Sequence, residues 1–166
     1  MLFNKEDVLS YLPHRDPFLF IDSVESIDFT HSQFKGEGHV ENREELVGAE
    51  VKAHFAVTDT VKVLEGHFPG NPILPGVVQI ETMAQAACFL TTCLFEDFRK
   101  VDIDVALLTV NDVKFRKPVT PGDNLVIYAK LLKHRGKMMS YDCRIECEGQ
   151  VVSASTLMAS MSYEIN

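Results

Sequence analysis

The chain of 166 residues is short of basic side chains. Sixteen lysines and arginines stand against twenty-four aspartates and glutamates, which gives a net charge of −8. The whole deficit lies in residues 1–100, which hold eight basic and sixteen acidic side chains, while residues 101–166 hold eight of each. A nucleic-acid-binding protein needs a basic face to meet the phosphates. We therefore expect no nucleic-acid partner.

Sorting signals and cysteine pairs are also lacking. Lys5, Glu6 and Asp7 place charges where a secretory signal peptide needs its apolar run, and the sequence contains no Asn-x-Ser/Thr site and no lipidation box. The cysteines form no CxxC pair and each lies in an apolar segment, so we expect buried, reduced thiols and no metal centre. These features predict a cytoplasmic protein. The four cysteines are Cys88, Cys93, Cys143 and Cys147.

The apolar residues are plentiful enough for a folded core. They make up 46% of the chain, and its length suits one domain spanning residues 1–166. Within it, residues 29–50 are polar and acidic and predict a hairpin or a surface excursion inserted into the domain. Its acidic residues are Glu37, Glu41, Glu44, Glu45 and Glu50.

Local patterns predict an α+β fold. Asn4 and Asp7 are suited to cap a short helix over 5–12, and residues 18–24 and 51–63 read as extended. Residues 139–147 alternate apolar and polar side chains, which is typical of a half-buried strand. Turns at 121–122, 135–136 and 148–149 would join neighbouring strands in an antiparallel sheet.

Residues 77–95 predict one long, mostly buried helix. Glu81 is the single charged side chain among these nineteen residues. The length alone would also suit a membrane span, but Gln79, Thr82 and Gln85 and the strands that follow argue against it. We therefore expect this helix to pack on the sheet and not to cross a membrane.

Two side chains near the start of this helix can move protons. Burial should raise the pKa of Glu81 unless it finds a partner, and a protonated Glu would serve as a general acid; a structural role is the open alternative. His67 lies in the segment 66–76, where three prolines and three glycines exclude regular structure. The free N–H groups of Gly76 and Val77 at the helix start could polarise a carbonyl oxygen.

Three motifs resemble one enzyme family. The runs LPHRDPFLFID (12–22), GHFPGNPILPGVVQIETMAQAA (66–87) and VNDVKFRKPVTPGD (110–123) resemble the FabZ-type 3-hydroxyacyl-[acyl carrier protein] dehydratases. The resemblance implies a hot-dog fold, in which an antiparallel sheet wraps a long central helix. It covers most of the chain outside residues 29–50.

The resemblance also implies a reaction. It is the dehydration of (3R)-3-hydroxyacyl-[acyl carrier protein] to the trans-2-enoyl product in fatty acid biosynthesis, without metal or cofactor. His67 would act at C2 of the acyl chain and Glu81 at the C3 hydroxyl, with each pair completed across a homodimer that can build a hexamer. Gly76 would bind the thioester carbonyl, and Val77, Phe68 and Ile80 would contact the substrate.

Two basic clusters could receive the acidic carrier protein or its phosphopantetheine phosphate, although both could equally be solvated surface. One contains Lys114, Arg116 and Lys117, and the other contains Lys133 and Arg135.

Other activities on the same fold stay open. A hot-dog acyl thioesterase would use the carboxylate to activate water, but it would not need His67. A dehydratase of a specialised acyl or polyketide-like pathway is a further reading, because Asp16 and Asn71 depart from residues that are frequent in the family. A non-catalytic acyl-binding subunit would be expected to lack His67 or Glu81, and both are present.

Overall fold

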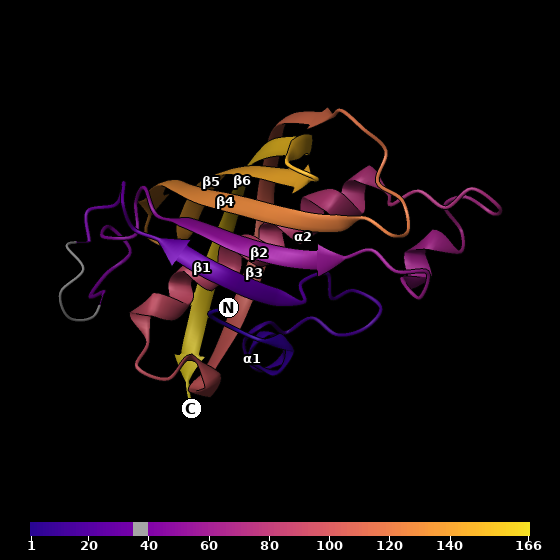
Figure 1. Ribbon diagram of the computed structural model, residues 1–166. Helices are drawn as coiled ribbons and strands as arrows, with labels where there is room; N and C mark the ends of the chain where they lie inside the picture. The colour runs from indigo at the N-terminus through magenta and orange to yellow at the C-terminus, as the bar shows by residue number, and fades with distance from the viewer. Residues whose placement is uncertain (35–39) are drawn as a thin grey trace.

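The computed structural model describes residues 1–34 and 40–166, and its centre is a six-stranded antiparallel sheet (Figure 1). The strand order is β1-β2-β4-β5-β6-β3. The alternating segment at 139–147 lies in β5 as expected, and the predicted turns at 135–136 and 148–149 join β4 to β5 and β5 to β6. The turn at 121–122 precedes β4 but does not join neighbouring strands, because the strand before it, β3, pairs with β6 at the far edge of the sheet. The strands are β1 (Ser23–Asp28), β2 (Glu50–Ala56), β3 (Val101–Phe115), β4 (Asn124–Arg135), β5 (Met138–Cys147) and β6 (Gln150–Ile165).

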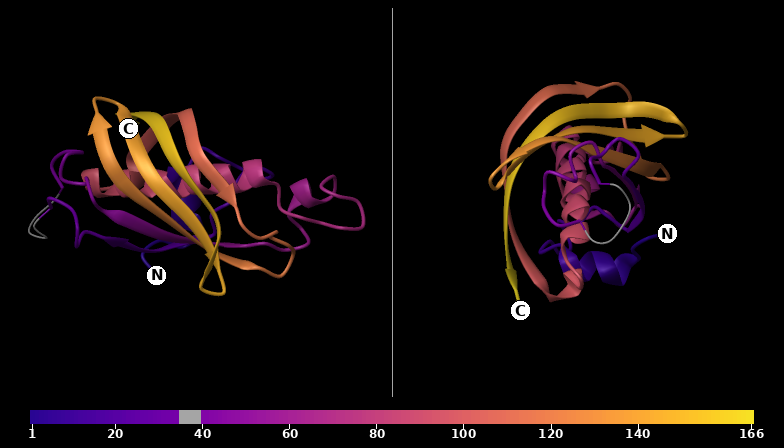
Figure 2. Two further views of the ribbon diagram at one scale, coloured as in Figure 1. Left: turned by 90° about the horizontal axis from the view of Figure 1, so that it is seen from above. Right: turned by 90° about the vertical axis from the view of Figure 1, so that its left-hand side faces the viewer.

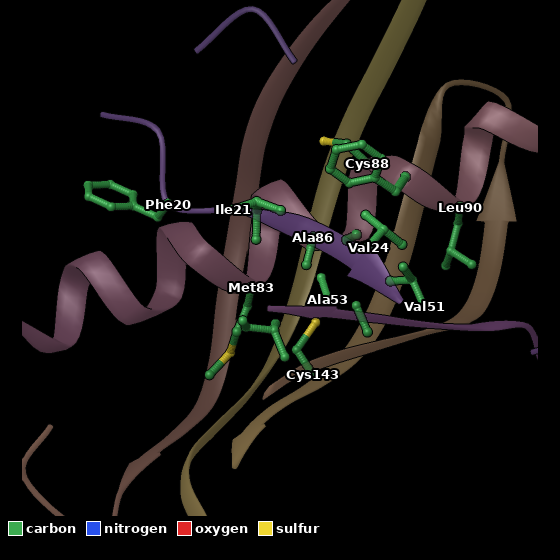
Figure 3. Close-up of a cluster of buried hydrophobic side chains, with 14 of the residues drawn as sticks. Phe20, Ile21, Val24, Val51, Ala53, Met83, Ala86, Cys88, Leu90 and Cys143 are labelled. Carbon is green, nitrogen blue, oxygen red and sulfur yellow. The ribbon is translucent and has the colours of Figure 1, made fainter. Parts of the chain in front are cut away.

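The sheet curves around the helix α2 (Gly76–Cys88), which runs through its concave side (Figure 2). The helix ends earlier than the sequence predicts, because residues Phe89–Leu94 tighten into a 3-10 helix. Small residues such as Ala86 allow close approach to the strands, and Met83 fills the space beside Ala53 and Cys143 (Figure 3). The segment Gly76–Leu94 is long and apolar enough to cross a membrane, but two-thirds of it is buried inside this fold.

The N-terminal helix α1 (Lys5–Tyr11) closes one end of the core. Asn4 accepts from the Glu6 and Asp7 amides, and Asp7 accepts from the Asn4 amide at 3.0 Å, so the predicted capping box is present. Tyr11 reaches inward to Thr91 at 2.7 Å. The Tyr11–Thr91 bond attaches the last residue of α1 to the 3-10 helix that follows α2.

Two predicted strands are partly wrong. Residues 18–22 are not extended sheet: the strand starts at Ser23, because Phe20 and Ile21 are buried as a loop against α2. Residues 57–63 also leave the sheet, with turns and a short 3-10 helix over Lys62–Leu64. In both cases apolar side chains indicate burial correctly, but the sequence does not show which element buries them.

The acidic segment 29–50 forms turns up to Glu50, where β2 begins, and no strand lies within residues 29–34 or 40–49. The predicted hairpin is therefore not observed in this part. Arg43 fixes the segment to the sheet by donating to the carbonyls of Gly136 at 3.1 Å and Met161 at 3.0 Å. Glu37 lies outside the described residues.

The edge strand β3 carries an unusual number of exposed apolar side chains. It pairs on one side with β6, and no other described strand pairs with it. Leu107, Leu108, Val110 and Phe115 are each more than one-third exposed. A long edge of this kind is open to pairing with another chain.

Candidate active site

His67 is held by the loop that precedes α2. Its Nδ1 lies 2.7 Å from the carbonyl oxygen of Ile73, and its ring stacks on Phe68 with centroids 4.0 Å apart. A carbonyl oxygen can only accept, so Nδ1 carries the hydrogen in this bond. The neutral ring therefore keeps the lone pair of Nε2 available, which is the arrangement of a base.

A groove of about 580 Å³ opens beside His67. Gly76 and Val77, at the first turn of α2, form part of its wall. The first amide of this turn to find a backbone partner is that of Val78, which donates to Pro75 at 3.0 Å, so the Gly76 and Val77 N–H groups have no backbone partner among the described residues. The remaining lining residues are Ile73, Leu74, Pro75, Gln79, Phe115, Arg116, Lys117 and Pro118. The groove thus brings a base next to amide donors that could bind an oxyanion.

Glu81 lies further along α2 and is bonded through one oxygen. Oε1 accepts from the Gln85 amide at 2.9 Å and lies 3.1 Å from His14 Nε2. Burial raises the pKa of Glu81, but the hydrogen bonds from His14 and Gln85 and the charge of His14 outweigh it, so the pKa is lowered. The exception that the prediction allowed therefore applies: Glu81 has partners in His14 and Gln85, and its pKa is lowered instead of raised, which favours the ionised carboxylate.

Gln85 joins Glu81 to the N-terminal motif. Its oxygen accepts from the Phe20 amide at 2.9 Å, and its nitrogen donates both to Phe18 O at 2.9 Å and to Glu81. This fully bonded amide fixes residues 18–20 on the helix one turn after Glu81. His14 belongs to the motif 12–22, but nothing in the sequence pattern indicates that His14 and Gln85 both contact Glu81.

His67 and Glu81 do not meet within one chain. No hydrogen bond or ion pair joins them among the described residues, and Glu81 does not line the groove that contains His67. The other residues predicted to contact the substrate do not all line this groove. Gly76 and Val77 line the groove, and Phe68 is half exposed on His67, whereas Ile80 packs partly buried against the core.

The two basic clusters lie apart. Arg116 and Lys117 line the groove with His67, while Lys114 is placed on β3 outside it. Lys133 and Arg135 line a different groove of about 420 Å³ beside Met138 and Met158. Only the first cluster is therefore placed next to the candidate base.

The described part of the chain contains no cluster of His, Cys, Asp and Glu that could hold a metal ion. The four cysteines are free thiols, with Cys88 and Cys143 buried and Cys93 and Cys147 partly buried.

An antiparallel sheet wrapped around one long helix defines the hot-dog fold. The fold of this chain resembles that of the dehydratase heterocomplex ApeI:P from Xenorhabdus doucetiae, with a TM-score of 0.69, 24% identity and coverage of 93% of this chain and 90% of that one. A hot-dog-like protein from Thermanaerovibrio acidaminovorans matches at a TM-score of 0.57 and 15% identity, covering 73% of this chain and 87% of the other.

Sequence relatives then identify the family. The FabA-like domain model matches residues 12–156. The 3-hydroxyacyl-[acyl-carrier-protein] dehydratase FabZ of Syntrophobacter fumaroxidans is 36% identical, covering 93% of this chain and 90% of the relative. The enzyme of the same name from Bartonella quintana is 38% identical, covering 93% and 86%. The chain belongs to the FabA-like family, among relatives of the FabZ type, which confirms both the resemblance and the predicted fold class.

Proposed function

We propose that this chain is a 3-hydroxyacyl-[acyl carrier protein] dehydratase of fatty acid biosynthesis. It would convert the (3R)-3-hydroxyacyl thioester reversibly to the trans-2-enoyl product. The relatives that carry this name support the assignment. The single observation that carries it is the groove that is lined both by His67, whose Nδ1 carries the hydrogen, and by Gly76, whose N–H has no backbone partner among the described residues.

Each group has a step in this reaction. His67 Nε2 removes a proton from C2, and the electron pair moves into the thioester carbonyl, whose developing negative charge is stabilised by the Gly76 N–H. The C3–O bond then breaks as the carbonyl re-forms. The proton taken from C2 passes from His67 to Glu81 and on to the leaving hydroxyl, so that water departs. An ionised Glu81 suits this sequence, because it is ready to receive that proton and gives it up readily.

The pair would have to be completed by a second copy of the chain. The separation of His67 from Glu81 within one chain supports a shared site, as do the exposed apolar side chains along the free edge of β3. Antiparallel pairing of two such edges is a self-complementary contact of the kind that builds twofold dimers. The hexamer implied by the resemblance stays a prediction.

Arg116 and Lys117 would receive the carrier protein. Both line the groove near His67, where a phosphopantetheine arm has to enter. A guanidinium and an ammonium group are well suited to bind its phosphate. Lys133 and Arg135, which line the other groove, are the weaker candidates for this contact.

The assay is the absorbance of the enoyl thioester after the purified protein meets 3-hydroxyacyl-[acyl carrier protein] substrates of several chain lengths. Release of free thiol is followed in the same samples. Enoyl formation without thiol release supports the dehydratase and ranks its substrates. Thiol release without enoyl formation would identify a thioesterase instead, since the fold alone serves both reactions. If neither enoyl thioester nor free thiol is formed, a non-catalytic acyl-binding subunit would be favoured.

A further inference from the structure

His14 contacts Glu81 from a part of the chain 67 residues earlier. Its Nε2 lies 3.1 Å from Glu81 Oε1, and each side chain is about one-quarter exposed. A contact in this setting is screened less by water than a surface ion pair. It is also a contact within one chain, so it exists before any partner subunit is added.

Both donors to Glu81 act on the same carboxylate oxygen. His14 and Gln85 approach Oε1, whereas Oε2 has no hydrogen-bond partner in the described part of the chain and is not enclosed by it. Two donors from different directions fix the plane of a carboxylate, which a single donor does not. The consequence is that Oε2 is the oxygen presented outward, in an orientation set by His14 and Gln85 together.

The segment that carries His14 is itself fixed on both sides. The Leu12 amide donates to Val8 O at 3.0 Å at the end of α1, and Arg15 Nη1 donates to the carbonyls of Leu12 and His14 at 2.7 Å. Beyond His14, the Gln85 amide bonds to Phe18 and Phe20. The imidazole is therefore held from the backbone, and a rigid support of this kind keeps a functional group in place.

The second ring nitrogen of His14, Nδ1, does not help to hold the ring in place. His14 Nδ1 is buried and has no hydrogen-bond partner within residues 1–34 and 40–166. A buried polar atom without a partner costs free energy, so its retention needs a reason. Among the described residues, Glu81 is the only partner of the His14 imidazole, which makes the carboxylate the reason for an imidazole at this position.

We propose that His14 is a positioning residue for Glu81, whose Nε2–H holds the carboxylate so that Oε2 faces the leaving hydroxyl. This inference rests on the proposed dehydratase function and adds to it a residue that acts through Glu81 without touching substrate.

Two amide substitutions separate this role from packing. The nitrogen of a glutamine reaches about as far along the side chain as histidine Nε2, whereas that of an asparagine ends one methylene short. We expect His14→Gln to keep kcat within a few-fold of the wild type. We expect His14→Asn to lower kcat roughly tenfold to a hundredfold with KM unchanged, because small misplacement of a reacting group has effects of that order. Equal kcat values in the two variants would overturn the proposal.

A double substitution checks that the effect passes through Glu81. In a Glu81→Gln background, adding His14→Asn is expected to change the residual rate by less than twofold. A further loss as large as that in the wild-type background would overturn the proposal, and thermal melting of each variant verifies that it is folded. If the wild type itself forms no enoyl thioester, the proposed function fails and this inference fails with it; an active wild type with equal variants overturns the inference alone.

Discussion

The ring of Phe115 lies directly against Gly76. A Cβ atom added at Gly76 would come within 2.5 Å of the ring carbon Cζ, closer than real side chains approach. Phe115 belongs to the exposed end of β3 and Gly76 to the first turn of α2, so this contact brings the edge strand against the amide that we assign to the thioester oxygen. The absence of a side chain at Gly76 is what lets the ring and the groove wall meet.

Substituting Gly76→Ala is therefore expected to damage activity more than stability. The half-exposed ring of Phe115 can turn away, but it then moves within the groove that holds His67. We expect kcat/KM to fall roughly tenfold or more, because a ring displaced within the groove shifts the substrate from its reacting position, and the melting temperature to change little. The matched control is Gly66→Ala, where a Cβ would meet nothing within 4 Å. Equal activity in the two variants would contradict the assignment.

The shared site predicts that two inactive variants restore each other. A chain with His67→Ala keeps its Glu81, and a chain with Glu81→Gln keeps its His67. After the two are unfolded together and refolded in equal amounts, half of the dimers contain one intact pair, so about a quarter of the wild-type activity should return. No recovery in the mixture, from variants that run as folded dimers in sizing experiments, would place both residues in sites of a single chain.

The two buried glutamines of α2 should differ sharply in their effect on stability. Gln85→Leu leaves the buried Phe20 amide without its partner, which costs about 1–3 kcal/mol, and it also removes the part-buried bond to the Phe18 carbonyl. In the part of the chain that the structure describes, the Gln79 side chain makes one long bond of 3.3 Å to Leu74, and its oxygen is buried without a partner. We expect Gln79→Leu to be close to neutral. Urea unfolding of both variants gives the comparison, and a larger loss for Gln79→Leu would show that these bonds are assigned wrongly.

Much of the chain could be read from local pattern. The capping box at Asn4 and Asp7 and the alternation in β5 depend on neighbours in sequence, and both are present. The sequence predicts a strand at Phe20, but the structure has a loop there. The Phe20 amide bonds to Gln85, which is 65 residues away, and local sequence does not show this contact. The partner that lowers the pKa of Glu81 could not be identified for the same reason: a helix with a single charge gives no sign that His14 lies beside it.

The lowered pKa of Glu81 predicts a stability difference in acid. Its value in the folded chain lies below the ordinary 4.5, so its contribution is complete above pH 4.5 and is lost as the pH falls through the folded value. The titratable groups that interact with it are His14 and Cys88, and the Cys88 thiol stays neutral because burial, with a smaller effect from the charge of Glu81, raises its pKa to about 12. Urea unfolding from pH 6 to pH 3 should show a steeper loss for the wild type than for Glu81→Gln. Parallel curves would mean that Glu81 is not stabilised as the anion.

The central claim is that His67 and Glu81 carry out the dehydration. The most direct measurement is the initial rate of enoyl-thioester formation from one 3-hydroxyacyl-[acyl carrier protein] substrate by the wild type, His67→Ala and Glu81→Gln at equal concentration. The account predicts turnover by the wild type and a loss of roughly a hundredfold or more in each variant, as for removal of a general acid or base. A wild-type rate retained by either folded variant would contradict it.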